Sequence, residues 1–118
     1  PTRRSSDLTK DLPEEIRNAA FEPLDDDHLQ LRDPYLEDVE FFLQDLRRGM
    51  PDGPFHLILC RNLAFTYFVE ETQLEILDRL HDRLQPGGYL VVGAHEELPE
   101  GGPSLEALPH CPSILRPA

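Results

Sequence analysis

The stretch from Phe55 to Asn62 constrains the fold more than any other part of this chain. It reads FHLILCRN, so apolar residues run together with little alternation. Such a run is typical of a strand that is covered on both faces of a parallel sheet. The run ends in Arg61 and Asn62, and ligands of open α/β sheets bind at the carboxyl ends of strands. The sequence therefore predicts a buried strand followed by a candidate site.

A parallel βαβ unit is predicted around this strand. Residues 70–84 place their apolar side chains on one helical face, begin with glutamates and are stopped by the Pro-Gly-Gly at 86–88. Residues 89–93 then form a second apolar run. Strand 55–60, helix 70–84 and strand 89–93 predict an α/β fold with a right-handed crossover.

Shorter patterns predict the remaining elements. Residues 11–21 read as a short helix that begins at Asp11, and residues 28–32 read as a short edge strand. Residues 39–43 are β-branched and aromatic enough for a further strand. Residues 113–116 read as a last edge strand. The three aspartates at 25–27 are read as a solvated turn, because a calcium loop needs alternating oxygen ligands and a glycine.

The charge balance argues against two classes of partner. The chain has 118 residues, with 11 basic and 23 acidic side chains and a net charge of -12. Such a surface repels phosphate backbones and anionic lipid. No apolar run approaches the roughly 20 residues of a membrane span, so we expect neither nucleic-acid binding nor membrane insertion. Cys60 and Cys111 lie far apart in no CxxC pattern, which favours reduced thiols and a cytoplasmic location.

Asp45 and Asn62 are the sharpest candidates for binding a ligand. Each follows an apolar strand by one or two residues, so both are expected at the same edge of a parallel sheet. A carboxylate and a carboxamide there can bind hydroxyl, amino or amide groups. The alternative is that each only caps the following turn. Arg61 either holds a ligand carboxylate or pairs with a surface acid, and Tyr67 either reaches the cleft or packs in the core.

The patterns of several other chemistries are missing. The five histidines show no spacing typical of zinc ligands, so no metal site is predicted. No GxGxxG motif follows a strand, and no nucleophile elbow surrounds a serine or cysteine. His95 and Glu96 follow the strand at 89–93 and form a less favoured candidate pair for proton transfer.

Two strings resemble a known family. FHLILCRN, followed by Tyr67-Phe68, an amphipathic helix and LQPGGYLVVGAHEEL, is similar to the S-adenosylmethionine-dependent methyltransferases of the chemotaxis-receptor (CheR) type. Those read close to FDLIxCRN, YF, a helix and LxPGGxLxxGxxExL. The resemblance spans nearly the whole chain. It implies a Rossmann-like methyltransferase sheet with S-adenosylmethionine as cofactor. It also implies that residues 1–118 are the C-terminal portion of a single methyltransferase-like domain, an incomplete sheet whose first strands and glycine loop lie upstream.

The resemblance implies roles for five residues by position. Asp45 and Leu46 resemble the polar-Leu pair that approaches the adenine end of the cofactor. Arg61 and Asn62 resemble the residues that line the cofactor pocket. Tyr67 resembles the family tyrosine near the methyl group, which makes it the candidate catalytic residue.

The sequence also departs from the family pattern. His56 stands where the family has aspartate, and Val69 stands where an acidic helix cap is usual. The run between Asn62 and Tyr67 is longer than in the common CRNxxxYF, which places the reach of Tyr67 in question.

Two functions follow from this resemblance. The first is S-adenosylmethionine-dependent methyl transfer to a protein carboxylate or small-molecule acceptor, by a longer enzyme of which this chain is part. The second is a catalytically inactive, methyltransferase-like binding or scaffolding module. For the chain alone we expect no activity and no measurable S-adenosylmethionine binding. A sheet without its first strands bares an apolar edge, so self-association through that edge is also expected.

Overall fold

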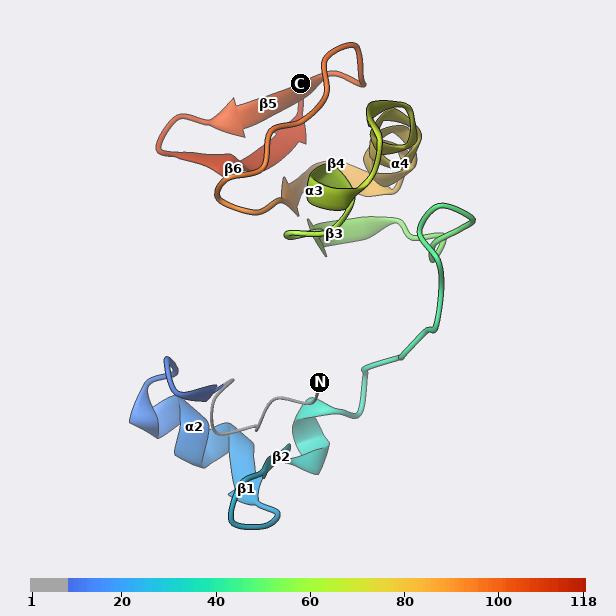
Figure 1. Ribbon diagram of the computed structural model, residues 1–118. Coiled ribbons are helices and arrows are strands. Elements are labelled where there is room, and N and C mark those ends of the chain that lie inside the picture. Colours follow the sequence, from blue (N-terminus) through green and yellow to red (C-terminus); the bar gives the residue numbers. More distant parts are fainter. Residues whose placement is uncertain (1–8) are drawn as a thin grey trace. The chain divides into compact units, whose positions relative to one another are not determined.

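The computed structural model describes residues 9–118. The chain divides into two compact units (Figure 1), the first ending at Phe42 and the second spanning Leu43–Ala118. All the candidate site residues named above belong to the second unit.

The first unit contains the short helix and the short strand that the sequence predicts. Its elements are α2 (Glu14–Ala20), β1 (Phe21–Pro23), β2 (Leu29–Leu31) and the 3-10 helix η1 (Asp33–Tyr35). β1 pairs with β2 in antiparallel orientation, a pairing that the sequence did not predict. The Asp25 carboxylate accepts a hydrogen bond from the Asp27 amide at 2.8 Å and is bonded to His28 Nδ1 at 2.8 Å. The aspartates thus form the turn between β1 and β2, as predicted.

The start of α2 differs from the prediction. Asp11 was expected to cap the helix, but the residue before its first turn is Pro13, and no side chain caps it. The fixed φ of proline suits the beginning of a helix without a capping side chain.

The second unit is built on a mixed four-stranded sheet. Its elements are β3 (Phe55–Leu59), α3 (Ala64–Tyr67), α4 (Glu70–Asp82), β4 (Leu84–Val91), β5 (Leu105–Leu108) and β6 (Cys111–Pro117). The strand order is β3-β4-β6-β5, with β3 parallel to β4 and the other neighbours antiparallel. The parallel β3–α4–β4 unit predicted from the sequence is confirmed, with other bounds. The helix ends at Asp82 rather than at 84, and the strand runs over Leu84–Val91 rather than 89–93, so the Pro-Gly-Gly at 86–88 lies within β4 and does not stop the helix.

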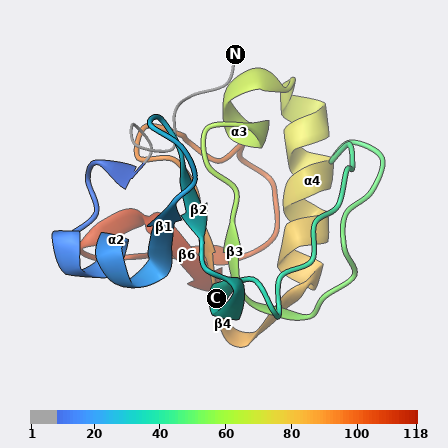
Figure 2. The same cartoon turned by 90° about the horizontal axis from the view of Figure 1, so that it is seen from below.

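The hydrophobic core lies between α4 and one face of this sheet. Ile76 and Leu77 of α4 and Leu90 of β4 are almost completely buried. They belong to one cluster that also contains Leu115 of β6. Figure 1 shows α4 beside β4, which it precedes in the chain, and Figure 2 shows α3 next to the beginning of α4. No helix that the structure describes, α4 included, is long and apolar enough to cross a membrane.

The other face of β3 is exposed, contrary to the prediction of a strand covered on both faces. Ile58 packs against the core, whereas Leu57 and Leu59 point to the opposite face because side chains alternate along a strand. These two leucines are 56% and 66% exposed. β3 is an edge strand whose only neighbour in the described sheet is β4.

Residues 39–43 do not form the predicted strand. Phe41 within this segment is 84% exposed, and the boundary between the two units falls after Phe42. A strand needs a neighbour for its backbone N–H and C=O groups, and none of the described strands pairs with this segment. The expectation that Asp45 and Asn62 follow neighbouring parallel strands is therefore wrong, because only Asn62 follows a strand of the described sheet.

The C-terminal strands are also arranged differently. The strand predicted at 113–116 is found as the longer β6, but it lies inside the sheet between β4 and β5. The edge on this side of the sheet is β5, a strand that the sequence did not predict. Proline lacks an N–H donor and is therefore confined to strand edges and strand starts. Pro112, the second residue of β6, lies at such a start.

Candidate functional site

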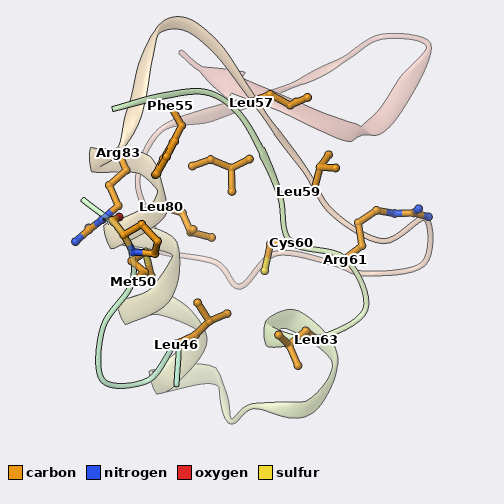
Figure 3. A pocket seen from close by; sticks show the side chains of 12 residues that line it. Leu46, Met50, Phe55, Leu57, Leu59, Cys60, Arg61, Leu63, Leu80 and Arg83 are labelled. Atoms are coloured by element: carbon orange, nitrogen blue, oxygen red, sulfur yellow. Dashed lines mark hydrogen bonds between the residues drawn. The ribbon is translucent and has the colours of Figure 1, made fainter. Parts of the chain in front are cut away.

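A groove runs along β3 in the second unit. Its volume is about 420 Å³, within the roughly 300–1,000 Å³ of small-molecule sites. Figure 3 shows Met50, Cys60 and Leu80 directed into it. Its lining consists of Leu46, Met50, Pro51, Phe55, Leu57, Ile58, Leu59, Cys60, Arg61, Leu63, Leu80 and Arg83. These walls are mainly apolar and suit the flat apolar part of a ligand.

Two arginines hold the outer wall of the groove. Arg79 belongs to α4, and Arg83 directly follows its last residue. Arg79 Nη1 donates hydrogen bonds to the carbonyl oxygens of Leu46 (3.4 Å) and Arg47 (3.2 Å). Arg83 Nε donates to the carbonyl oxygen of Pro51 at 2.8 Å. The segment that carries Leu46 and Met50 has no regular secondary structure, so these bonds fix it against the helix. Neither arginine was among the candidate residues named from the sequence.

Asp45 does not point into the groove. Its carboxylate accepts hydrogen bonds from the Arg47 amide (3.0 Å), Nε (3.0 Å) and Nη2 (2.8 Å). The bonds from the Arg47 side chain, followed by that from its amide, lower the pKa of Asp45 to about 2. The Arg47 guanidinium also lies 5.4 Å from the centre of the Phe68 ring. The structure therefore shows the turn-capping alternative for Asp45, while its contact with a cofactor stays a prediction. Leu46, in contrast, does line the groove.

Glu96 joins the end of β3 to the end of β4. Its Oε1 accepts hydrogen bonds from the amides of Asn62 (2.7 Å) and Gly93 (2.7 Å), and its Oε2 accepts one from Thr66 Oγ1 (2.8 Å). Burial raises the pKa of Glu96, but the donors, led by the Asn62 and Gly93 amides, outweigh it, so the net pKa is lowered. A carboxylate held ionised in this way is a poor proton acceptor at neutral pH, which argues against the His95–Glu96 pair as proton-transfer machinery.

Asn62 adopts a left-handed backbone conformation, with φ of 56°. Its side chain lies over Gly93: a Cβ added at Gly93 would collide with Asn62 Oδ1 and lie 2.8 Å from Glu96 Oε1. Asn62 is absent from the groove lining, whereas its neighbours Arg61 and Leu63 contribute to it. The binding of a cofactor by Asn62 therefore stays a prediction.

The remaining candidates lie at or outside the margin of the groove. Arg61 lines its end, and Figure 3 shows the guanidinium directed away from the centre. Tyr67 ends α3, is 74% exposed and is not part of the lining. The alternative of Tyr67 as a core ring is wrong, because Phe65 takes the buried position in α3. A role for Tyr67 near a methyl group stays a prediction.

The sequence reasoning missed the Glu96 network. Gly93 and Glu96 lie in the loop after β4, whereas Thr66 belongs to α3, and only the glycine and glutamate spacing after the strand gave a signal. Residues 9–118 contain no cluster of three or more histidine, cysteine, aspartate or glutamate side chains placed to hold a metal ion.

Comparison with known proteins points to one family. Residues 4–111 match the family CheR methyltransferase, SAM binding domain. The chemotaxis protein methyltransferase of Vibrio parahaemolyticus is 35% identical over 92 residues, which cover 77% of this chain and 33% of that protein. That of Listeria innocua is 30% identical over 89 residues, covering 75% and 33%. Chemotaxis protein methyltransferase 1 of Pseudomonas aeruginosa is 48% identical over 46 residues, covering 39% and 16%.

These matches confirm the resemblance found in the sequence and the cofactor that it implies, since the matched domain is the one that binds S-adenosylmethionine. The mixed α/β sheet is consistent with a methyltransferase of this type. The chain spans about a third of the length of the Vibrio and Listeria proteins. The chain belongs to the CheR methyltransferase family, in the SAM-binding domain of that family.

Proposed function

We propose that this chain supplies part of the S-adenosylmethionine site of a longer methyltransferase, which methylates a protein carboxylate or a small-molecule acceptor. The observation that carries the proposal is the groove along β3. It brings Leu46 together with Arg61 and Leu63, and the family resemblance assigns the segments of these residues to the cofactor. The sheet would then be the later part of a Rossmann-like methyltransferase domain.

The groove fits the chemistry of the cofactor. Its apolar walls suit the adenine ring, and the rim residue Arg61 suits the carboxylate of the methionine moiety. Asp45 would bind the amino or hydroxyl groups of the adenosine end after releasing Arg47. The net charge of -12 favours a ligand that carries a sulfonium, as a weak and salt-screened bias.

The reaction needs alignment more than acid–base chemistry. S-adenosylmethionine supplies the methyl group: a bond forms between an acceptor oxygen and the methyl carbon as the bond from that carbon to sulfur breaks. An ionised carboxylate acceptor has no proton to lose, so positioning supplies much of the rate enhancement. Tyr67 is proposed to lie near the methyl group, and the first strands and glycine loop are proposed to lie upstream of residue 1.

We also propose that the protein is cytoplasmic. Cys60 and Cys111 are both free. Free thiols are typical of proteins in the reducing interior of the cell.

An inactive binding or scaffolding module is the second candidate. The side chain of Asp45, one of the two sharpest candidates, is bonded to Arg47. That of Asn62, the other, lies against Gly93 and is not part of the groove lining. Tyr67 lies outside the groove lining, and His56 and Val69 depart from the family pattern. These observations favour loss of catalysis.

Calorimetric titration with S-adenosylmethionine tests the first proposal. We expect the natural polypeptide that carries residues 1–118 to bind the cofactor and to transfer a labelled methyl group, and we expect the 118-residue chain alone to show no binding. Leu59→Ala removes an apolar wall of the groove and is expected to weaken binding by about tenfold or more.

The matched control is Leu24→Ala. Leu24 is exposed to 63%, close to the 66% of Leu59, but it belongs to the first unit and does not line the groove. Binding without methyl transfer would support the inactive module. Micromolar affinity of the 118-residue chain alone would contradict the idea that part of the site is missing.

Self-association of the isolated chain is a separate prediction. Leu57 and Leu59 are exposed on β3, an edge strand that has one neighbour in the described sheet, and such edges pair with other chains. We expect a dimer or larger species in sedimentation of the 118-residue chain. Leu57→Lys should shift it to monomer, whereas Leu24→Lys should not. A clean monomer of the unmodified chain would contradict this prediction.

A further inference from the structure

We propose that Glu96 is a positioning residue for the methyl-donor site. Its carboxylate holds the turn after β3, and that turn places Arg61 and Leu63 at the end of the groove. The inference rests on the proposed function. It adds a residue that is not part of the groove lining and that acts through Asn62.

The geometry of the carboxylate supports this role. One oxygen accepts hydrogen bonds from the backbone amides of Asn62 and Gly93, both at 2.7 Å. The other accepts a hydrogen bond from the Thr66 hydroxyl at 2.8 Å. These donors come from the turn after β3, the end of β4 and α3. Hydrogen bonds to an ionised acceptor are shorter and stronger than neutral ones. A single side chain therefore ties the ends of both parallel strands to the helix that follows β3.

The backbone of Asn62 explains why the turn needs this support. Its φ of 56° lies in the left-handed region, which few residues other than glycine and asparagine adopt. The residues on either side of it, Arg61 and Leu63, both line the groove. A change in the backbone at Asn62 would therefore move both lining residues. Without Glu96, the Asn62 amide would lose the acceptor that it has in this conformation.

Glu96 lies outside the hydrophobic core, so its role in positioning the turn can be distinguished from a contribution to the stability of the whole unit. Glu96 is half-buried and does not belong to the hydrophobic core cluster between α4 and the sheet. Its bonds reach two strand ends and a short helix rather than the centre of β4 or α4. We therefore expect its removal to loosen the turn and leave the core packed.

The experiment compares Glu96→Ala with Glu96→Gln in the natural polypeptide that carries the chain. Calorimetry gives the affinity for S-adenosylmethionine, and amide hydrogen exchange gives the protection of Asn62 and Gly93. For Glu96→Ala we expect binding weaker by about tenfold to a hundredfold and faster exchange at both amides, with protection in α4 and β4 unchanged. Glu96→Gln keeps an oxygen acceptor for both amides and should recover most of the affinity.

Glu97→Ala is the matched control, because Glu97 is the exposed neighbour in the same loop, and both readouts should equal those of the unmodified protein. Unchanged affinity in Glu96→Ala would overturn the positioning role, even if exchange at Asn62 became faster. Loss of protection throughout α4 and β4 would also overturn it, in favour of a general structural role. Failure of the unmodified protein to bind S-adenosylmethionine would overturn the proposed function and the positioning role with it, and the exchange readout would still show whether Glu96 holds the turn.

Discussion

Leu90→Ala is expected to lower the free energy of unfolding of the 118-residue chain by about 2–5 kcal/mol. Leu90 is 0% exposed and lies in β4, paired with Ile58 on one side and Leu115 on the other. It belongs to the same buried cluster as Ile76 of α4. Truncation removes buried methyl groups and leaves a cavity where α4 meets the sheet. Because domains of this size are stable by only about 5–15 kcal/mol, the loss would be a large fraction of the total.

Urea denaturation followed by circular dichroism measures this loss, and Leu59→Ala is its control. Leu59 has the same chemistry and lies on the neighbouring strand, but it is 66% exposed. At a protein concentration low enough to keep the chain monomeric, so that self-association through β3 does not contribute, we expect its truncation to change the free energy of unfolding by no more than about 0.5 kcal/mol. Equal losses for the two variants would contradict the placement of the core on the α4 face of the sheet.

The parts of the fold that could be predicted from the sequence are those in which local patterns and packing agree. The apolar run at 55–60 and the one-sided helix at 70–84 each indicate the element that the structure shows. The glycines at 87 and 88 were read as the stop of the helix, but they lie inside β4. Residues 39–43 are also β-branched and aromatic enough for a strand, and they form none. An apolar alternation shows that a segment has a face to bury, but pairing depends on a partner strand, which a local pattern cannot reveal.

The sequence predicted where in the fold the candidate site lies, but not the directions in which its side chains point. Strand ends drew attention to Asp45 and Asn62, and the groove does lie beside both segments. The direction of each side chain depends on its partners. The Asp45 side chain turns to Arg47, two residues away. At Asn62 it is the backbone amide that donates to Glu96, 34 residues away, and this bond holds the left-handed turn from which the side chain projects. The second partner could not be found from spacing near Asn62, because it enters from the loop after β4.

Gly93→Ala is the substitution expected to disturb this loop most. A Cβ at this position would overlap Asn62 Oδ1 and lie 2.8 Å from Glu96 Oε1. Glu96 has little freedom to move, because its Oε1 accepts hydrogen bonds from the backbone amides of both Asn62 and Gly93. We expect the crowding to lower the free energy of unfolding by about 1–3 kcal/mol. If the proposed function holds, S-adenosylmethionine binding will weaken too, because Arg61 and Leu63 flank the displaced residue.

A double-mutant cycle identifies the cause of that loss. Asn62→Gly removes the carboxamide that the new methyl group meets, and glycine accepts the left-handed backbone of this position. The variant carrying both Asn62→Gly and Gly93→Ala should therefore be more stable than the sum of the single effects allows. Gly49→Ala is the control, since nothing lies within 4 Å of a Cβ at Gly49, and it should leave stability within about 0.5 kcal/mol. Strictly additive losses at positions 62 and 93 would show that these side chains do not meet, and the close contact between the ends of β3 and β4 would then be wrong.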